Sequence, residues 1–203
     1  MTRTLAILLL FLLTSQSFAE LKAGAAKIDI TPPIGIPMWG YASRRDKPAV
    51  GIQDRLHARA LTLTLDEKTI ALVSLDLGRA PTRDSMQRIR LAVKKIGVDH
   101  LFVTGSHTHH GPALELDKVP RGKKPYVREL EEKLIQIITQ AVKMRKSAKL
   151  AVTSEKVAFN RNRHSRRKVK PLDNELLILR VEDEDGEPIA HAVNFAAHPT
   201  FHS

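Results

Sequence analysis

The 203-residue sequence contains no cysteine. A disulfide framework, a thiolate metal site and a lipid-modified cysteine are therefore excluded. Any metal ion has to be bound by histidine, carboxylate or tyrosine side chains. Internal repeats and low-complexity tracts are also missing. Because the sequence shows no recognised nucleic-acid-binding motif either, nucleic acid is not expected as a partner.

Long apolar runs are missing after the first few residues. The one run that stands out, residues 5–13, follows a basic start and precedes the small-residue pattern Ser17-Phe18-Ala19. This arrangement predicts a signal peptide over residues 1–19 and a secreted or periplasmic protein. The run is shorter than the roughly 18 residues of an ordinary membrane span, and no later stretch approaches that length. We expect residues 20–203 to form one soluble domain.

Acidic residues are scarce between positions 118 and 170. This segment contains 17 Lys or Arg and only 4 Glu, a balance of +13, whereas the whole chain carries +11. One interpretation is a solvated helix face with basic loops. The other is an exported basic module that binds anionic lipid or an anionic polymer, with peripheral contact to an anionic membrane surface.

Hydrophobic periodicity predicts a mixed α and β fold. Alternating or continuous apolar patterns predict strands over residues 26–30, 56–65, 69–75, 100–104, 151–159, 175–181 and 189–197. Turns are expected at residues 66–68 and 184–187. A first helix is predicted to begin after Thr82, its N-cap, and to end near Gly97.

A second helix is predicted over residues 126–144. Its core-facing stripe has helical spacing and consists of Leu130, Leu134, Ile137, Ile138 and Ala141. The order of strands and helices favours a mixed sheet with helices packed on it.

The segment Ser106-His107-Thr108-His109-His110-Gly111-Pro112 follows the strand predicted at 100–104. If the extended geometry persists, His107 and His109 point to the same side, because side chains alternate along a strand. Two imidazoles placed in this way are suited to binding a metal, or to one ligand and one proton carrier. His110 is equally compatible with an ordinary loop residue.

Two other predicted strands also end at polar residues. The 189–197 strand ends at His198, which is followed by proline, and the 69–75 strand ends at Asp76. Ligand sites of sheet proteins gather at such strand ends, so we expect the three termini to converge. Taken alone, a capped strand end also explains His198. Asp76 is predicted as a partner that fixes the tautomer of a histidine.

Several motifs occur in an order that resembles a known family. They cover nearly all of the chain after residue 19 and comprise residues 26–33 (AKIDITPP), 40–41 (GY), 51–52 (GI), 55–60 (RLHARA), 74–76 (SLD), 106–109 (SHTH), 111–112 (GP) and 194–198 (NFAAH). In this combination the sequence resembles the N-terminal part of the neutral/alkaline non-lysosomal ceramidase family.

This resemblance implies a zinc-dependent amidase that cleaves the N-acyl bond of ceramide to sphingosine and fatty acid. It implies that His107 and His198 are zinc ligands and that His109 is an active-site group that polarises or handles a proton. An active-site arginine of the family matches Arg161, although Arg163 competes for the same match. The expected substrate is therefore a ceramide-like lipid.

The sequence departs from the family by its length. In the family the remaining zinc ligands, a glutamate and a tyrosine, and the serine proposed as nucleophile lie further along a longer chain. We therefore expect residues 20–203 to be the first part of a catalytic domain, with weak or no amidase activity alone. Three alternatives remain open: a related hydrolase acting on another amide or ester, the basic binding module, and a fragment destabilised by an unpaired strand at 189–197.

Overall fold

The computed structural model describes residues 20–45, 47–114 and 125–200, so the predicted signal peptide lies outside the described residues. The elements in chain order are β1 (Lys22–Asp29), η1 (Ala42–Arg44), β2 (His57–Leu65), β3 (Lys68–Leu75), α1 (Arg83–Lys94), β4 (His100–Gly105), α2 (Tyr126–Lys143), β5 (Lys146–Lys156), β6 (Glu175–Asp183) and β7 (Pro188–Phe195). No helix in these ranges is long and apolar enough to cross a membrane.

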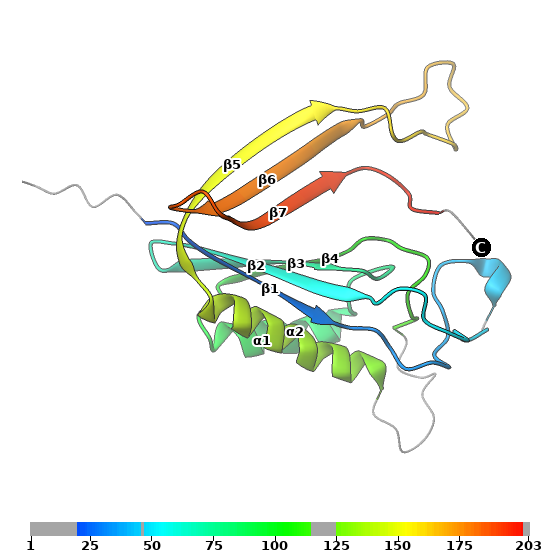
Figure 1. The fold of residues 1–203 in the computed structure, drawn as a ribbon. Helices are drawn as coiled ribbons and strands as arrows, with labels where there is room; N and C mark the ends of the chain where they lie inside the picture. Colours follow the sequence, from blue (N-terminus) through cyan, green and yellow to red (C-terminus); the bar gives the residue numbers. More distant parts are fainter. Residues whose placement is uncertain (1–19, 46, 115–124, 201–203) are drawn as a thin grey trace, which may run out of the picture.

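The strands form one mixed sheet in the order β4-β3-β2-β1-β5-β6-β7. Strands β3 and β4 are parallel, and the other neighbouring pairs are antiparallel. The mixed sheet with packed helices is thus confirmed. Only two residue pairs, Lys22 with Ser147 and Ala23 with Lys146, join β1 to β5. Strands β5–β7 therefore swing over one face of β1–β4 and form an arm above it (Figure 1).

Helices α1 and α2 cover the other face of β1–β4 (Figure 1). The predicted stripe of α2 is confirmed, because all five of its apolar side chains are fully buried. They pack with inward-facing residues of the strands, such as Ala58, Val73 and Leu75, in the main core. Alternation along each strand puts these residues on the helix side.

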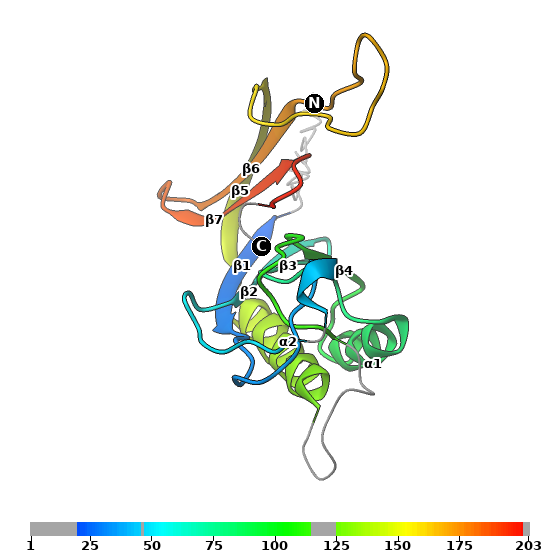
Figure 2. The ribbon, with the colours of Figure 1, turned by 90° about the vertical axis from the view of Figure 1, so that its right-hand side faces the viewer.

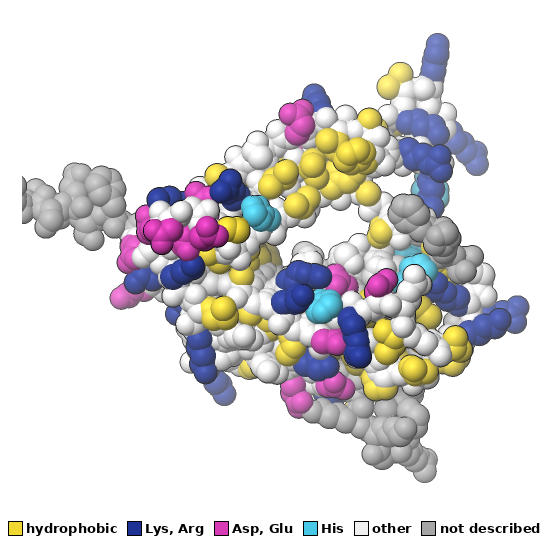
Figure 3. Space-filling view, viewed as in Figure 1, with side chains coloured by type: hydrophobic (Ala, Val, Ile, Leu, Met, Phe, Trp, Pro, Cys, Tyr) yellow, Lys and Arg dark blue, Asp and Glu magenta, His cyan; other side chains and the backbone are white. Residues whose placement is uncertain are grey.

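A smaller cluster of apolar side chains joins strands β1–β4 to the arm. Its buried members are Ala23 and Leu61 from β1–β4 and Ala148 and Val181 from the arm. This face of the sheet carries a cavity of about 730 Å³, lined by strands β1–β4 and by β7. A short strand joint and a small apolar cluster thus connect the arm to β1–β4, and a hollow lies between the two parts (Figure 3).

Several strand boundaries differ from the prediction, and those of β1 and β5 differ most. Strand β1 begins at Lys22 instead of residue 26, and β5 spans 146–156 instead of 151–159. The added residues of β1, 22–25, pair with β2, and the first two of them also pair with β5. In β5, residues 146–147 pair with β1 and residues 148–150 pair with β6. Gly24 allows α2 to pack closely on β1, because a Cβ there would lie 2.2 Å from the carbonyl oxygen of Ala141 in α2.

Candidate metal centre

Three histidines from two distant parts of the chain meet at one end of the molecule. One ring nitrogen from each of His107, His109 and His198 lies within 4.8 Å of the other two. His107 and His109 lie in the turn that follows β4, whereas His198 follows β7 of the arm. The sequence-based expectation that these strand ends converge agrees with this geometry.

His107 is oriented by the backbone of a neighbouring strand end. Its backbone N–H donates to the carbonyl oxygen of Leu77, and its Nδ1 lies 3.0 Å from the carbonyl oxygen of Gly78. A carbonyl can only accept, so Nδ1 carries the proton and Nε2 offers a lone pair. This is the arrangement commonly found around metal-binding histidines.

The extended geometry assumed for residues 107–109 is wrong. Strand β4 ends at Gly105, and His107 has a φ of 62°, in the left-handed region that only a few per cent of non-glycine residues adopt. The rings of His107 and His109 nevertheless lie 5.2 Å apart, because the turn brings them together. Strained backbone of this kind clusters at functional sites.

Two aromatic rings support the histidines. Trp39 makes edge contacts with His107 and His109 at ring separations of 5.0 and 5.1 Å, and Tyr41 lies 4.8 Å from His109. Glycines make room for this packing. A Cβ on Gly78 would lie 2.0 Å from the Trp39 ring, and one on Gly40, whose φ is +110°, would lie 2.5 Å from the His109 ring.

His109 is the buried member of the cluster, only 7% exposed. Its backbone carbonyl accepts a hydrogen bond from Arg44, while its Nδ1 has no partner among the described residues. Burial lowers the pKa of His109 below its ordinary value, and nearby His198, His107 and Arg44 lower it further. The ring is therefore neutral near pH 7, and the lone pair of its Nε2 faces His198.

His198 is bonded to an arginine of the arm. An Nη of Arg163 lies 2.6 Å from His198 Nδ1, and His198 Nε2 lies 3.1 Å from His109 Nε2. Because guanidinium only donates, Nδ1 of His198 accepts and the proton lies on Nε2. Desolvation and the charge of Arg163 lower the pKa of His198. Arg161, the arginine carried over from the family, lines a surface hollow beside Lys170.

Asp76 does not reach the histidine cluster in the way expected. Its carboxylate lies 2.9 Å from an Nη of Arg59 and accepts the backbone N–H of His57. The nearest ring nitrogen, Nδ1 of His57, is 3.9 Å away. The tautomer-fixing acceptor for the cluster is instead the Gly78 carbonyl, three residues after the end of β3.

The donor set fits a zinc-type ion. Three neutral imidazoles are a recurring catalytic zinc set, and two nitrogens bound tetrahedrally at about 2.0 Å lie about 3.3 Å apart. The separation of 3.1 Å between His109 Nε2 and His198 Nε2 is close to that value. Binding through Nε2 of His198 requires its proton to move to Nδ1, and Arg163 then has to leave.

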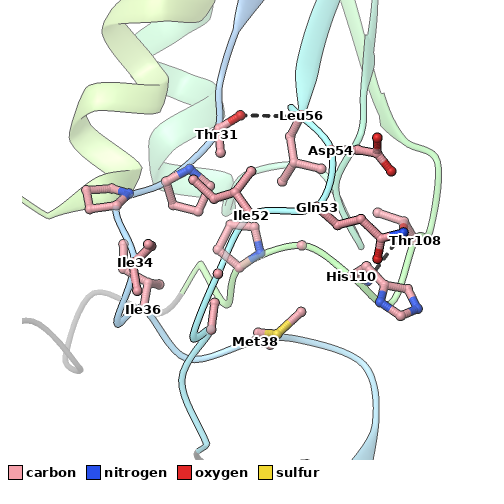
Figure 4. A pocket seen from close by; sticks show the side chains of 16 residues that line it. Thr31, Ile34, Ile36, Met38, Ile52, Gln53, Asp54, Leu56, Thr108 and His110 are labelled. Atoms are coloured by element: carbon pink, nitrogen blue, oxygen red, sulfur yellow. Dashed lines mark hydrogen bonds between the residues drawn. The ribbon is translucent and has the colours of Figure 1, made fainter. Parts of the chain in front are cut away.

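The same turn has a second, apolar side. A pocket of about 490 Å³ is lined by Thr108, His110, Gly111 and Pro112 of the turn and by the loop of residues 31–56. Figure 4 shows the apolar side chains of that loop, among them Ile34, Ile36, Met38 and Ile52, around this space. His107 and His109 thus face the cluster, whereas the alternate residues Thr108 and His110 face the pocket.

Sequence reasoning missed several contributors. Tyr41 belongs to the matching motif at residues 40–41 and Trp39 lies just before it, but neither has a role assigned from the sequence. The single tryptophan of the chain, in a loop rich in Gly and Pro, is the signal that could have identified this contact. Arg163, which competes with Arg161 for the match to the family's arginine, is the one that contacts His198. No sequence signal identifies the Gly78 carbonyl, because every residue has one.

Comparisons with known proteins concern the family and the fold of the chain. Residues 21–202 match the family described as neutral/alkaline non-lysosomal ceramidase, N-terminal. The neutral ceramidase of Pseudomonas aeruginosa superimposes with a TM-score of 0.74 at 22% identity, over 89% of this chain and 32% of that chain. A ceramidase complexed with C2 gives a TM-score of 0.75 with the same identity and the same coverage. The chain thus spans about a third of these structures.

Proposed function

Because the chain belongs to the neutral/alkaline non-lysosomal ceramidase family, we propose that it supplies the histidine part of a zinc-dependent amidase acting on ceramide-type sphingolipids. The observation that carries the proposal is the cluster of three histidines. The apolar pocket on the other side of the same turn is suited to a hydrocarbon chain. A ceramidase of this fold complexed with C2 supports the substrate class.

The proposed roles are divided among the three imidazoles. His107 and His198 hold the zinc ion through one ring nitrogen each, and the carbonyl of Gly78 fixes the proton of His107 on Nδ1. The bound ion supplies a Lewis acid that polarises the scissile carbonyl and lowers the pKa of a water molecule. Buried and neutral, His109 accepts or donates a proton beside them.

Two arginines are candidates for the active-site arginine of the family. Arg161 is assigned by resemblance, and Arg163 is the residue that contacts His198. Further ligands and the serine nucleophile of the family are proposed to come from polypeptide beyond the part compared, since this chain spans 32% of the ceramidase chain. Residues 20–203 alone are accordingly expected to bind zinc and to hydrolyse amides weakly or not at all. The signal peptide predicted over residues 1–19 supports the proposal that the protein acts outside the cytoplasm.

Zinc binding tests the proposal directly. The chain is dialysed against buffered zinc, and its metal content and its hydrolysis of fluorescent N-acyl sphingosine are measured. We expect one zinc ion per chain, lost in His107→Ala and retained in the control His191→Ala, which removes an exposed histidine of β7. Metal-free protein that hydrolyses neither amides nor esters would refute the proposal.

His109→Ala separates two roles within the site. If His109 handles a proton, the variant keeps its zinc and loses residual hydrolysis. If His109 is a third ligand, the zinc affinity of the variant falls as it does in His107→Ala. The structure is compatible with three imidazole ligands, so metal content decides between the two roles.

A further inference from the structure

The end of the molecule that carries the histidine cluster also carries two exposed basic loops. The first, residues 157–174, connects β5 and β6 and contains six cations but one acidic residue, Asp173. Those cations are Arg161, Arg163, Arg166, Arg167, Lys168 and Lys170. The second loop, residues 34–52, contains three cations, Arg44, Arg45 and Lys47, and one acidic residue, Asp46. Arg45 and Lys47 are exposed. In Figure 3 dark-blue side chains gather on the first loop, at the upper right.

Large apolar side chains project between these cations. In loop 157–174 the exposed ones are Phe159, 81% exposed, Val169, 83% exposed, and Leu172. Val169 lies directly between Lys168 and Lys170 in the sequence. Loop 34–52 adds Ile34, Val50 and Ile52, of which Val50 is 93% exposed. Exposed apolar side chains among cations are costly in water unless another surface receives them.

Contacts through the histidine cluster connect the two loops. Arg163 of the first loop bonds to His198, His198 lies against His109, and Arg44 beside Arg45 donates to the carbonyl of His109. Both loops face the viewer in Figure 2, with loop 157–174 at the top and η1 near the centre. The cluster therefore lies between two surfaces of the same chemical character.

We propose that loops 157–174 and 34–52 together dock the protein on an anionic phospholipid bilayer, with the histidine cluster facing the lipid. Within the described residues the cations of loop 157–174 form no salt bridge, so their charge is available. Basic residues near an anionic bilayer attract it, and apolar side chains gain free energy by entering its interface. An anionic polymer would use the cations but leave Phe159 and Val169 in water.

Co-sedimentation with vesicles tests this surface without any assay of activity, so it can fail independently of the proposed amidase function. The chain is mixed with vesicles of phosphatidylcholine, alone or with added phosphatidylglycerol. We expect binding only to the anionic vesicles and weakening as ionic strength rises from about 0.05 to about 0.5 M, which shortens the Debye length. Equal binding to both vesicle types, or binding to heparin without binding to vesicles, would overturn the proposal.

A charge-matched pair of variants locates the surface. The loop variant replaces Arg166, Arg167, Lys168 and Lys170 with Gln. Its control replaces Arg83, Arg90 and Lys94 of α1 and its C-cap Lys95, all exposed, with Gln. At about fivefold per basic residue, the loop variant should lose several hundredfold in affinity, and the control should bind like the wild type. An equal loss in both would show attraction by net charge alone and would overturn the assignment.

Val169→Ser tests the apolar part of the interaction. This exposed side chain makes no core contact, so circular dichroism should be unchanged. We expect binding severalfold weaker than that of the wild type, at both low and high salt. Binding equal to the wild type at both salt concentrations would show that the loop does not enter the bilayer interface, and the proposal would be wrong.

Discussion

Replacing Glu131 with glutamine should destabilise the protein and should do so in a pH-dependent way. Glu131 lies on α2 with its side chain only 9% exposed, and it binds Arg88 of α1 at 2.8 Å and Arg128 at 2.5 Å. Burial alone would raise the pKa of Glu131. Hydrogen bonds from Arg88, Ser85 and Arg128 outweigh burial and lower it from 4.5 to about 2.

The size of the effect follows from this pKa. The difference between 4.5 and about 2 corresponds to about 3 kcal/mol of unfolding free energy at neutral pH. The side chains of Arg88 and Arg128 are 44% and 33% exposed, and solvent screens part of the attraction. We therefore expect Glu131→Gln to lose about 2 kcal/mol at pH 7.

The sign of the pH dependence is fixed because the folded-state pKa is the lower one. The stabilisation is complete above pH 4.5 and is lost as the pH falls toward 2. The gap between wild type and variant should therefore narrow over this interval, as measured by urea unfolding followed by circular dichroism. Glu129→Gln is the control, since Glu129 is 43% exposed and forms a one-turn pair with Lys133. It should change stability by about 0.5 kcal/mol or less.

Two results would refute the reasoning. A loss in Glu131→Gln no larger than in Glu129→Gln would show that the buried carboxylate contributes nothing beyond a surface pair. A loss that stays constant from pH 7 to pH 2 would show that packing of the amide, rather than the charge, is responsible.

Two further predictions concern the histidine cluster. Gly78→Ala places a Cβ 2.0 Å from the Trp39 ring, so Trp39 has to move. We expect the free energy of unfolding to fall by about 1–3 kcal/mol and zinc binding to weaken. In the control Gly51→Ala the added Cβ meets nothing within 4 Å, so neither quantity should change. Thermal unfolding and zinc titration of both variants check this, and wild-type zinc affinity in Gly78→Ala would contradict it. Arg163→Gln should raise zinc affinity, because the guanidinium no longer holds the His198 proton on Nε2. Competition with a chelator measures the zinc affinity. An unchanged or lower affinity would show that Arg163 does not compete with the ion.

Helix α2 and the β2–β3 hairpin could be predicted because their signals are local. The apolar stripe of α2 repeats at helical spacing, and Asp66 and Glu67, with φ of 45° and 66°, make a two-residue turn between two apolar strands. The first residues of β5 could not be predicted in this way. Lys146 and Ser147 carry no strand pattern, and their pairing with β1 depends on a partner over a hundred residues away.

The residues of the candidate site likewise divide into those with a local sequence signal and those placed by tertiary contacts. His107, His109 and His198 were identifiable because histidine is a chemically specific residue placed at strand ends. The choice between Arg161 and Arg163 depends on the path of loop 157–174, which local propensity does not determine. The left-handed backbone of His107 is likewise a tertiary effect, since hydrogen bonds to the end of β3 impose it.

Only two residue pairs join β1 to β5, so an ion at the metal centre would add a second connection between the arm and the body. His198 belongs to the arm, whereas His107 and His109 belong to the body, so an ion shared among them closes a loop between two parts that few backbone hydrogen bonds connect. An ion that binds only the closed arrangement stabilises it in proportion to the logarithm of its concentration. Amide hydrogen exchange at Ala23 and Ala148 should then slow as zinc is added. The exchange rate at the joint would therefore report the fraction of chains that have zinc bound.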